Sequence, residues 1–492
     1  MKNYILAIDQ GTSSCRSILF NLEGNIVGRA QQEFKQYYPK AGWVEHDPQE
    51  IWTRQQEVSR QVLKQNNISA EEVAAIGIAN QRETVVAWDK TTGQPLAPAI
   101  VWQDRRTTDR CEDLKNQGWQ NSIHESTGLI IDPYFSGSKI EWLLNHNAAV
   151  KKAFKENKLL VGTIDSWLVW KLTAGEAHIT DYTNASRTML YNIRNKEWDN
   201  RLLELFGIPG NILPKVINSA EIAGETHPSF LGSKIPIAGI AGDQQAAAYG
   251  QLCFHKGMVK NTYGTGCFML MNVGEEFITS QNGLLTTLMC DANGKACYGL
   301  EGSIFIAGAA IQWLRDELGF IQTAAESQDL AEDLTHNDGV YFVPAFSGLG
   351  TPYWNMEARG LISGLTRGTT QKHIVRAALE AIAYQSKDVL HAMENDAKLK
   401  LSALRVDGGA LANDFLMQFQ ADILNIAIQR PTIIETTAQG AAYLTGLSTG
   451  KWTPGDLEEK YRGEKTFSPL MSEENRTMLY KGWKQAIQRT LS

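Results

Sequence analysis

The stretch YILAIDQGTSSCRSILFN, residues 4–21, alternates short apolar runs with polar turns. Tyr4–Ile8 and Ser17–Phe20 are the apolar runs, and a turn rich in glycine and hydroxyl side chains joins them. This order predicts a β-hairpin followed by a second turn. A related order returns in Met258–Asn272. The two predicted hairpins indicate a duplicated unit.

The duplication predicts two domains of similar size, which we place at residues 1–248 and 249–492. A chain of 492 residues is too long for one ordinary hydrophobic core, which agrees with this division. Strand and helix patterns alternate along it. Val73–Ala79 is apolar throughout, as in a buried strand, and His373–Leu390 places apolar residues on one helical face. These patterns predict an α/β fold.

The composition excludes several classes of partner. Lysine and arginine number 47 against 54 acidic residues, for a net charge of -7, so we expect no nucleic acid partner. No apolar run is long enough to span a membrane. The six cysteines form no CxxC pair, which indicates neither a disulfide framework nor a zinc site. We therefore expect a cytoplasmic protein.

The run IAGDQQAAA, Ile240–Ala248, places one aspartate between small residues where a strand pattern changes to a helix pattern. Asp243 has two interpretations. Aspartate is a favoured helix N-cap, so it could serve only to begin the helix. It is also placed where a catalytic base would lie.

The usual phosphate-binding loops are absent from the sequence. It contains no GxxxxGK[ST] run and no GxGxxG between a strand and a helix, which argues against P-loop and Rossmann mechanisms. Three other glycine-rich turns follow strand patterns, at Gly11–Ser14, Gly264–Gly266 and Gly408–Ala410. Backbone N–H groups and hydroxyls in such turns can donate hydrogen bonds to phosphate oxygens.

Several motifs together resemble a known family. They are DQGTSSCR at Asp9–Arg16, the GDQQ turn, YGTG, VDGGALAND at Val406–Asp414, YFSGSKIEWLLNH at Tyr134–His146 and GLISGLTRGTTQKHIVRAALE at Gly360–Glu380. They resemble the FGGY sugar and polyol kinases of the actin-like ATPase superfamily. The resemblance implies an α/β fold of two actin-like (ribonuclease H-like) domains, each a mixed five-stranded sheet flanked by helices, with a cleft between them.

Two further segments are similar to the polyol-binding segments of the glycerol kinases within this family. They are NQRETVVAWD at Asn80–Asp89 and AIVWQDRRT at Ala99–Thr107. The resemblance implies ATP-dependent phosphorylation of glycerol to sn-glycerol 3-phosphate. One alternative is an FGGY kinase for a longer substrate, of the xylulose or gluconate type, with a roomier site. The other is an actin-like ATPase that is not a kinase and gains nothing from glycerol.

The resemblance also assigns the acceptor site. Asp243 is the general base, which takes the proton of the attacking hydroxyl. The glycerol hydroxyls are assigned to Arg82, Glu83, Tyr134, Asp243 and Gln244. Trp102 and Phe268 form the apolar wall against the carbon backbone. Taken alone, the adjacent Arg82 and Glu83 favour a surface ion pair over a binding site.

The nucleotide side follows from the same resemblance. Asp9 orients Mg²⁺ through water, and Thr12, Ser13, Ser14 and Arg16 hold the transferring phosphoryl group of ATP. The remaining nucleotide contacts are assigned to Thr265, Gly308, Gln312, Gly409 and Asn413. Glycine at positions 308 and 409 would leave room for the adenine or its ribose, although glycine also marks close helix packing.

Two expectations concern assembly and regulation. The resemblance implies a homo-oligomer, a dimer or a tetramer. Some bacterial relatives bind a sugar bisphosphate through an arginine in a glycine-rich loop, but here Phe230–Pro236 is short and carries Lys234. Lysine is a point charge and not a bidentate fork, so the resemblance gives that site no support.

Overall fold

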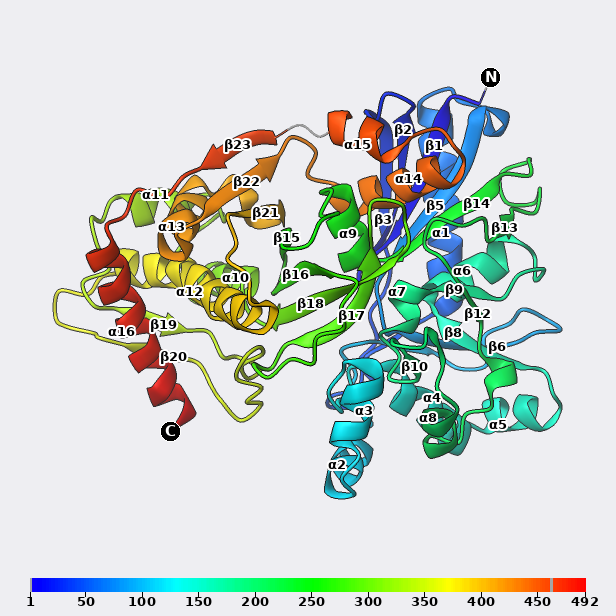
Figure 1. Ribbon diagram of the computed structural model, residues 1–492, viewed down its shortest axis with the longest axis horizontal. Coiled ribbons are helices and arrows are strands. Elements are labelled where there is room, and N and C mark those ends of the chain that lie inside the picture. Colours follow the sequence, from blue (N-terminus) through cyan, green and yellow to red (C-terminus); the bar gives the residue numbers. More distant parts are fainter. Residues whose placement is uncertain (1, 461–462) are drawn as a thin grey trace.

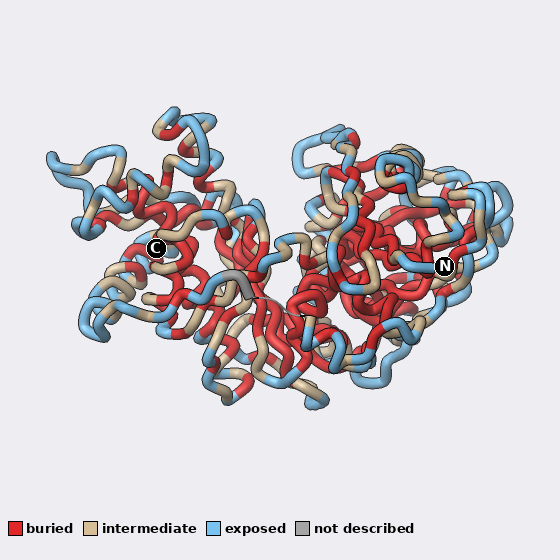
Figure 2. Tube along the Cα trace, turned by 90° about the horizontal axis from the view of Figure 1, so that it is seen from above, coloured by how far each residue is buried: buried red, intermediate tan, exposed pale blue. Residues whose placement is uncertain are grey.

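The computed structural model of the protein describes residues 2–460 and 463–492. Figure 1 shows two lobes, each containing one large sheet with helices packed against it. Seen from above in Figure 2, buried residues concentrate inside each lobe, and exposed residues lie on the peripheral loops. The predicted α/β class is confirmed.

The first lobe contains a six-stranded sheet in the order β13-β14-β5-β1-β2-β3. Its strands are β1 (Tyr4–Gln10), β2 (Ser14–Asn21), β3 (Ile26–Glu33), β5 (Val73–Asn80), β13 (Gly224–Glu225) and β14 (Pro236–Gly242). All residues of β5 are buried, as expected of an inner strand covered on both faces. The predicted hairpin is present, because β1 and β2 pair antiparallel.

The second lobe contains a seven-stranded sheet in the order β17-β18-β16-β15-β21-β22-β23. Its strands are β15 (Val259–Tyr263), β16 (Cys267–Gly274), β17 (Leu285–Cys290), β18 (Ala296–Ile304), β21 (Ala403–Gly408), β22 (Ala427–Pro431) and β23 (Gly463–Phe467). The second predicted hairpin is also present, because β15 and β16 pair antiparallel.

The two sheets share one inner topology. In the order β3-β2-β1-β5-β14 the first two pairings are antiparallel and the next two parallel, and β18-β16-β15-β21-β22 repeats this pattern. The duplicated unit predicted from the hairpins is therefore confirmed. The sheets have six and seven strands and not five, because the edge strands β13, β17 and β23 extend the repeated core.

A smaller sheet lies beside the first lobe and was not predicted. Its order is β4-β7-β6-β8, with β4 (Glu45–His46), β6 (Val85–Asp89), β7 (Ala99–Ile100) and β8 (Leu159–Thr163). The remaining short strands pair in twos: β9 (Ile179–Asp181) with β12 (Lys215–Ile217), β10 (Tyr191–Asn192) with β11 (Glu197–Trp198), and β19 (Tyr341–Val343) with β20 (Leu361–Ser363). The smaller sheet positions the segments around Glu83 and Trp102.

Helices surround the sheets. Those that precede β15 are α1 (Pro48–Gln65), α2 (Thr108–Asn116), α3 (Gln120–Thr127), α4 (Ser136–His146), α5 (Ala148–Lys155), α6 (Ile164–Leu172), α7 (Tyr182–Ala185), α8 (Asn200–Leu205) and α9 (Asp243–Gly250). Those of the second lobe are α10 (Gly308–Asp316), α11 (Glu326–Glu332), α12 (Gln371–Ala397), α13 (Asp414–Leu424) and α16 (Glu473–Leu491). Across the described ranges, no helix combines the length and apolar character needed to cross a bilayer.

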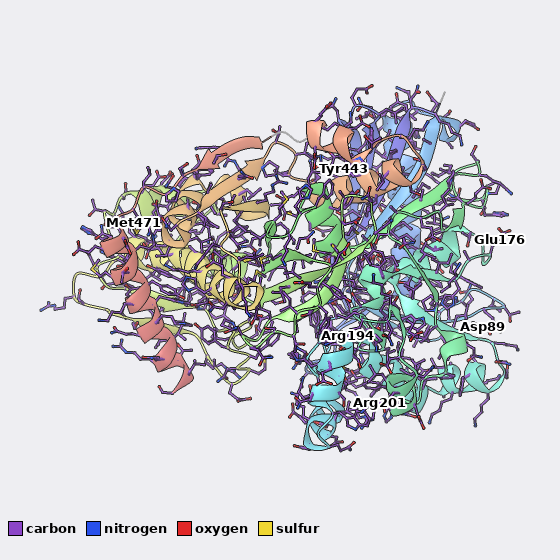
Figure 3. The ribbon with its side chains drawn as sticks, in the orientation of Figure 1. Asp89, Glu176, Arg194, Arg201, Tyr443 and Met471 are labelled. Atoms are coloured by element: carbon purple, nitrogen blue, oxygen red, sulfur yellow. The ribbon has the colours of Figure 1, made fainter. Side chains whose placement is uncertain are left out.

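The chain returns to the first lobe near its C-terminal end. α14 (Thr436–Ser448) packs against β1, β5 and β14, and Figure 3 labels Tyr443 of this helix beside those strands. The contact is close, since a Cβ at Gly77 would lie 2.4 Å from the Ala441 carbonyl oxygen. Farther on, Trp452 donates to the Leu22 carbonyl at 2.7 Å, ahead of α15 (Pro454–Lys460). A boundary after residue 248 remains our proposal, with α14 and α15 assigned to the first lobe.

Candidate active site

Asp243 lies where β14 ends and α9 begins. The N-cap position belongs to Gly242, and Asp243 is the first helical residue, so the interpretation of Asp243 as the N-cap is wrong. Its carboxylate accepts a hydrogen bond from the Gln244 backbone N–H at 2.7 Å and lies 3.2 Å from Arg82 Nε. The side chain is 33% exposed. The carboxylate is therefore held in place and still open to a ligand.

Arg82 and Glu83 belong to a buried ion network and not to the surface. Both side chains are 2% exposed. The Arg82 guanidinium donates to both carboxylate oxygens of Glu301, at 2.6 and 3.2 Å, and to Gln245 Oε1 at 3.2 Å. Glu83 accepts from Arg187 Nε at 2.7 Å, and Arg187 also reaches Glu301 at 3.0 Å. The network joins the lobes, because Glu301 is on β18.

The two carboxyl groups of this network, on Glu83 and Glu301, have pKa values shifted in opposite directions. Burial disfavours ionisation of Glu301, but Arg187 and Arg82 outweigh it and lower its pKa to about 2. Burial raises the pKa of Glu83 despite the neighbouring Arg82 and Arg187. Glu83 also has a left-handed backbone, with φ of 60°, and such conformations in non-glycine residues occur often at functional sites. The ionised Glu301 is thus the anchor of both arginines.

Three aromatic side chains meet beside the ion network. The Trp102 ring lies edge-on to Tyr134, with centroids 5.6 Å apart, and edge-on to Phe268 at 6.4 Å. Trp102 Nε1 donates to Thr12 Oγ1 at 3.0 Å. The structure therefore brings the predicted wall residues together from both lobes and connects them to the first glycine-rich turn.

That first turn joins β1 to β2. Gly11 N donates to the Ser14 carbonyl at 2.9 Å, which closes the turn. Thr12 is partly exposed and Ser13 is exposed, whereas Ser14 is buried and its hydroxyl accepts from Gln31 at 3.2 Å. Thr12 and Ser13 are therefore the more available of the three predicted hydroxyls.

Asp9 and Arg16 lie next to this turn. Arg16 Nη1 is 3.5 Å from Asp9 and 3.4 Å from Glu435, which precedes α14. Burial raises the pKa of Asp9 to about 6, against the opposing effect of Arg16. No group of three or more acidic, histidine or cysteine side chains within the described residues is arranged to hold a metal ion. Asp9 would thus contribute to a metal site only together with water or a ligand.

The second glycine-rich turn joins β15 to β16 and lies against the start of α10. Thr265 is exposed, and its carbonyl accepts from the backbone N–H groups of Ala307 and Ala309, at 2.8 and 3.1 Å. A Cβ at Gly308 would lie 2.6 Å from the Gly264 carbonyl oxygen. Close packing alone therefore requires glycine at 308, without any reference to adenine.

The third turn follows β21, beside the second. A Cβ at Gly408 would lie 2.2 Å from the Tyr263 carbonyl oxygen, and Gly408 has φ of 97°, so this position requires glycine. Apart from the adjoining residues of its own turn, no atom of the described chain lies within 4 Å of a Cβ built at Gly409. The space over Gly409 is thus open to a ligand.

Gln312 and Asn413 flank these turns. Gln312 is exposed on α10. Asn413 is the N-cap of α13, since its Oδ1 accepts from Leu416 N at 2.9 Å, and its Nδ2 donates to Ser327 at 3.2 Å. Asn413 therefore has a structural role of its own, whatever it does for a nucleotide.

Comparison with known proteins agrees with this geometry. The N-terminal domain of the FGGY family of carbohydrate kinases matches residues 4–250, and its C-terminal domain matches residues 259–449. This chain belongs to the FGGY family. It is 57% identical to a glycerol kinase from Alkaliphilus metalliredigens, over 100% of this chain and 99% of that one. It is 58% identical to a glycerol kinase from Carboxydothermus hydrogenoformans, over 99% and 98%.

A solved structure of an FGGY relative matches the whole fold. The glycerol kinase of Plasmodium falciparum, crystallised with ADP, superposes with a TM-score of 0.93 at 37% identity, over 100% of this chain and 99% of that one. The two-lobed arrangement of this FGGY kinase is therefore shared with an enzyme that binds a nucleotide.

Some residues of this FGGY site were not predicted. They are Arg187, Gln245, Lys260 and Glu301, and all four are buried. Two of them could have been identified from the sequence. Glu301 is the one charged residue of β18, and Lys260 is the one charged residue of β15. A single charge in an otherwise buried strand is rarely left without a partner.

Proposed function

We propose that this protein transfers the terminal phosphoryl group of ATP to glycerol, forming sn-glycerol 3-phosphate and ADP. The observation that carries the proposal is the partly exposed Asp243 carboxylate, held 3.2 Å from the buried Arg82. The aromatic wall of Trp102 and Phe268, with Tyr134 beside Trp102, reaches the same region. Lys260 donates both to the Phe268 carbonyl and to Gln244, the neighbour of Asp243. The names of the relatives at 57% and 58% identity support the same acceptor.

Each side chain has a distinct task in this proposal. Asp243 accepts the proton of a terminal hydroxyl as that oxygen bonds to the γ-phosphorus and the bond to the ADP oxygen breaks. Arg82, fixed by Glu301, donates to a glycerol hydroxyl, while Glu83, Tyr134 and Gln244 bind the others. The aromatic wall covers the carbon backbone and excludes water, which would otherwise compete as the acceptor.

The turns hold the phosphates. Thr12 and Ser13 donate to the transferring group, with Ser14 behind them, and Arg16 offsets its charge. Thr265 reaches the nucleotide phosphates from the second lobe. The nucleotide itself lies along Gly308, Gln312, Gly409 and Asn413, over the open space at Gly409.

The site also suits Mg²⁺. This ion keeps several waters and binds through one or two carboxylates together with phosphate oxygens. Asp9 supplies such a carboxylate through water, so the absence of a larger acidic cluster in the described chain is compatible with the ion. When bound, Mg²⁺ neutralises charge on the phosphate oxygens.

The test is a panel of acceptors. ADP release by the purified protein is measured with glycerol, D-xylulose, D-gluconate or no acceptor, and the phosphorylated product is quantified. We expect glycerol to give the highest kcat/KM, with one product formed per ADP. Faster turnover of a sugar would support the xylulose- or gluconate-type alternative, and glycerol-independent hydrolysis would support an actin-like ATPase.

Two wider expectations belong with this proposal. A cytoplasmic location is supported by the six cysteines, all of which are buried and free, as is usual in a reducing compartment. A homo-oligomer, dimer or tetramer, is expected from the family resemblance. Light scattering of the purified protein measures its mass, and a monomer at working concentration would contradict the second expectation.

A further inference from the structure

A buried lysine of the second lobe contacts the acceptor site. Lys260 lies on β15 and is 0% exposed. Its Nζ donates to Gln244 Oε1, to Thr262 Oγ1 at 2.7 Å and to the Phe268 carbonyl at 3.2 Å. An ammonium group has three N–H donors, and all three are used. Lys260 thereby connects Gln244, which follows the proposed base Asp243, to Phe268 of the aromatic wall.

This contact determines which end of the Gln244 amide faces Lys260. An ammonium group can only donate, so the amide oxygen must point toward it and the NH₂ group away. Gln244 Nε2 donates to no other residue in the described part of the chain. The adjacent Asp243 carboxylate can only accept. Asp243 therefore offers an acceptor, and Gln244 offers a free donor. A hydroxyl group can both donate and accept, so one hydroxyl could bond to the two side chains together.

The charge of Lys260 is not needed for packing. Burial lowers the pKa of Lys260, while Asp407 and Asp243 oppose this effect. Methionine would fill the same space, but it could not donate to the Gln244, Thr262 and Phe268 oxygens. The hydrogen bonds, and not the volume of the side chain, therefore account for a lysine here.

We propose that Lys260 is a positioning residue that turns the Gln244 amide, so that its NH₂ group donates to an acceptor hydroxyl. The proposal rests on the glycerol kinase function and deepens it. Lys260, a residue of the second lobe, then determines that Gln244 presents a donor, and not an acceptor, to the substrate. The other polar groups of the acceptor site come from the first lobe. The proposal predicts that Lys260 contributes to the preference for glycerol over acceptors that lack one hydroxyl.

The first experiment compares Lys260→Met with the control Lys256→Met. Lys256 is an exposed lysine of the same lobe, and its ion pair within the described residues is with the exposed Glu276 at 3.4 Å. Loss of one hydrogen bond to substrate corresponds to about a tenfold rise in glycerol KM. We expect this rise for Lys260→Met with the KM for ATP unchanged, and a smaller kcat/KM ratio of glycerol to 1,3-propanediol. The control should match the unsubstituted protein.

Two further variants test the amide directly. Gln244→Glu can keep the contact with Lys260 but has no NH₂ group, so it should also raise glycerol KM, even if Lys260→Met failed to fold. In a double-mutant cycle, Lys260→Met should add nothing to Gln244→Leu. Additive effects, or an unchanged glycerol KM in Gln244→Glu, would overturn the proposal. An unsubstituted protein that does not phosphorylate glycerol would instead contradict the proposed function.

Discussion

Replacing Glu301 with glutamine tests the buried ion network most directly. Glu301 is the carboxylate shared by Arg82, at 2.6 and 3.2 Å, and Arg187, at 3.0 Å. Glutamine keeps the shape of the side chain but removes the charge, and its NH₂ group would face an arginine donor. Both guanidinium groups would then remain buried with less compensation.

The contribution of Glu301 to the free energy of unfolding follows from its pKa and from the usual strength of buried ion pairs. The pKa of Glu301 is about 2 in the folded protein against an ordinary 4.5, and a pKa difference of one corresponds to about 1.4 kcal/mol. Ionised Glu301 therefore stabilises the fold by about 3 kcal/mol at neutral pH. Removing one partner from a buried ion pair costs about 3–5 kcal/mol, which agrees. Because the folded pKa is the lower one, this contribution is complete above about pH 4.5 and is lost as the pH falls through about 2.

The assay combines unfolding with kinetics. The free energy of unfolding in urea at pH 7 should fall by about 3 kcal/mol for Glu301→Gln. Glycerol KM should rise, because Arg82 loses its anchor. The control is Glu332→Gln, at an exposed position on α11 that forms no ion pair in the described chain. If Glu301→Gln unfolds at the same urea concentration as this control, and glycerol KM does not change, the network does not have the role described.

Three other outcomes are expected. Asp243→Asn should lower kcat by about 10²–10⁴-fold with nucleotide affinity retained in a binding assay, and near-normal turnover would exclude Asp243 as the base. Since the pKa of Asp9 is about 6, its carboxyl becomes neutral in more acidic solution. The Mg²⁺ concentration that gives half the maximal rate should therefore rise as the pH is lowered from 7 to 5. An unchanged Mg²⁺ requirement would argue against Asp9 as a metal residue. Gly242→Ala places a Cβ 2.7 Å from Arg82 Cγ and Cδ. Because the Arg82 guanidinium must then shift, kcat/KM for glycerol should fall by up to about 100-fold. Unchanged kinetics would show that Arg82 can shift without loss of activity.

The sequence predicted the features that depend on short-range order. The two hairpins were correct because apolar runs and glycine-rich turns are local patterns. The helix predicted at His373–Leu390 was correct for the same reason, and α12 extends it to Gln371–Ala397. The position of Asp243 at the end of a strand was also clear from its neighbours, although the cap itself is Gly242.

What could not be predicted depends on contacts between distant segments. Arg82 and Glu301 are 219 residues apart in sequence, and no local pattern indicates that they pair. The return of α14 to the first lobe is a similar case, because its small residues suit many neighbours. At Gly308 the sequence suggested room for a ligand, whereas the neighbour that excludes a side chain is the Gly264 carbonyl.

The return of α14 limits how the two lobes can move. The chain crosses between the lobes from α9 to β15 and again from β22 to α14 (Figure 1). These two connections, together with the packing of α14 on β1, β5 and β14, should restrict the relative motion of the lobes more than a single connection would. The same packing means that a fragment ending at residue 250 would leave the α14 side of β5 and β14 bare and prone to aggregate.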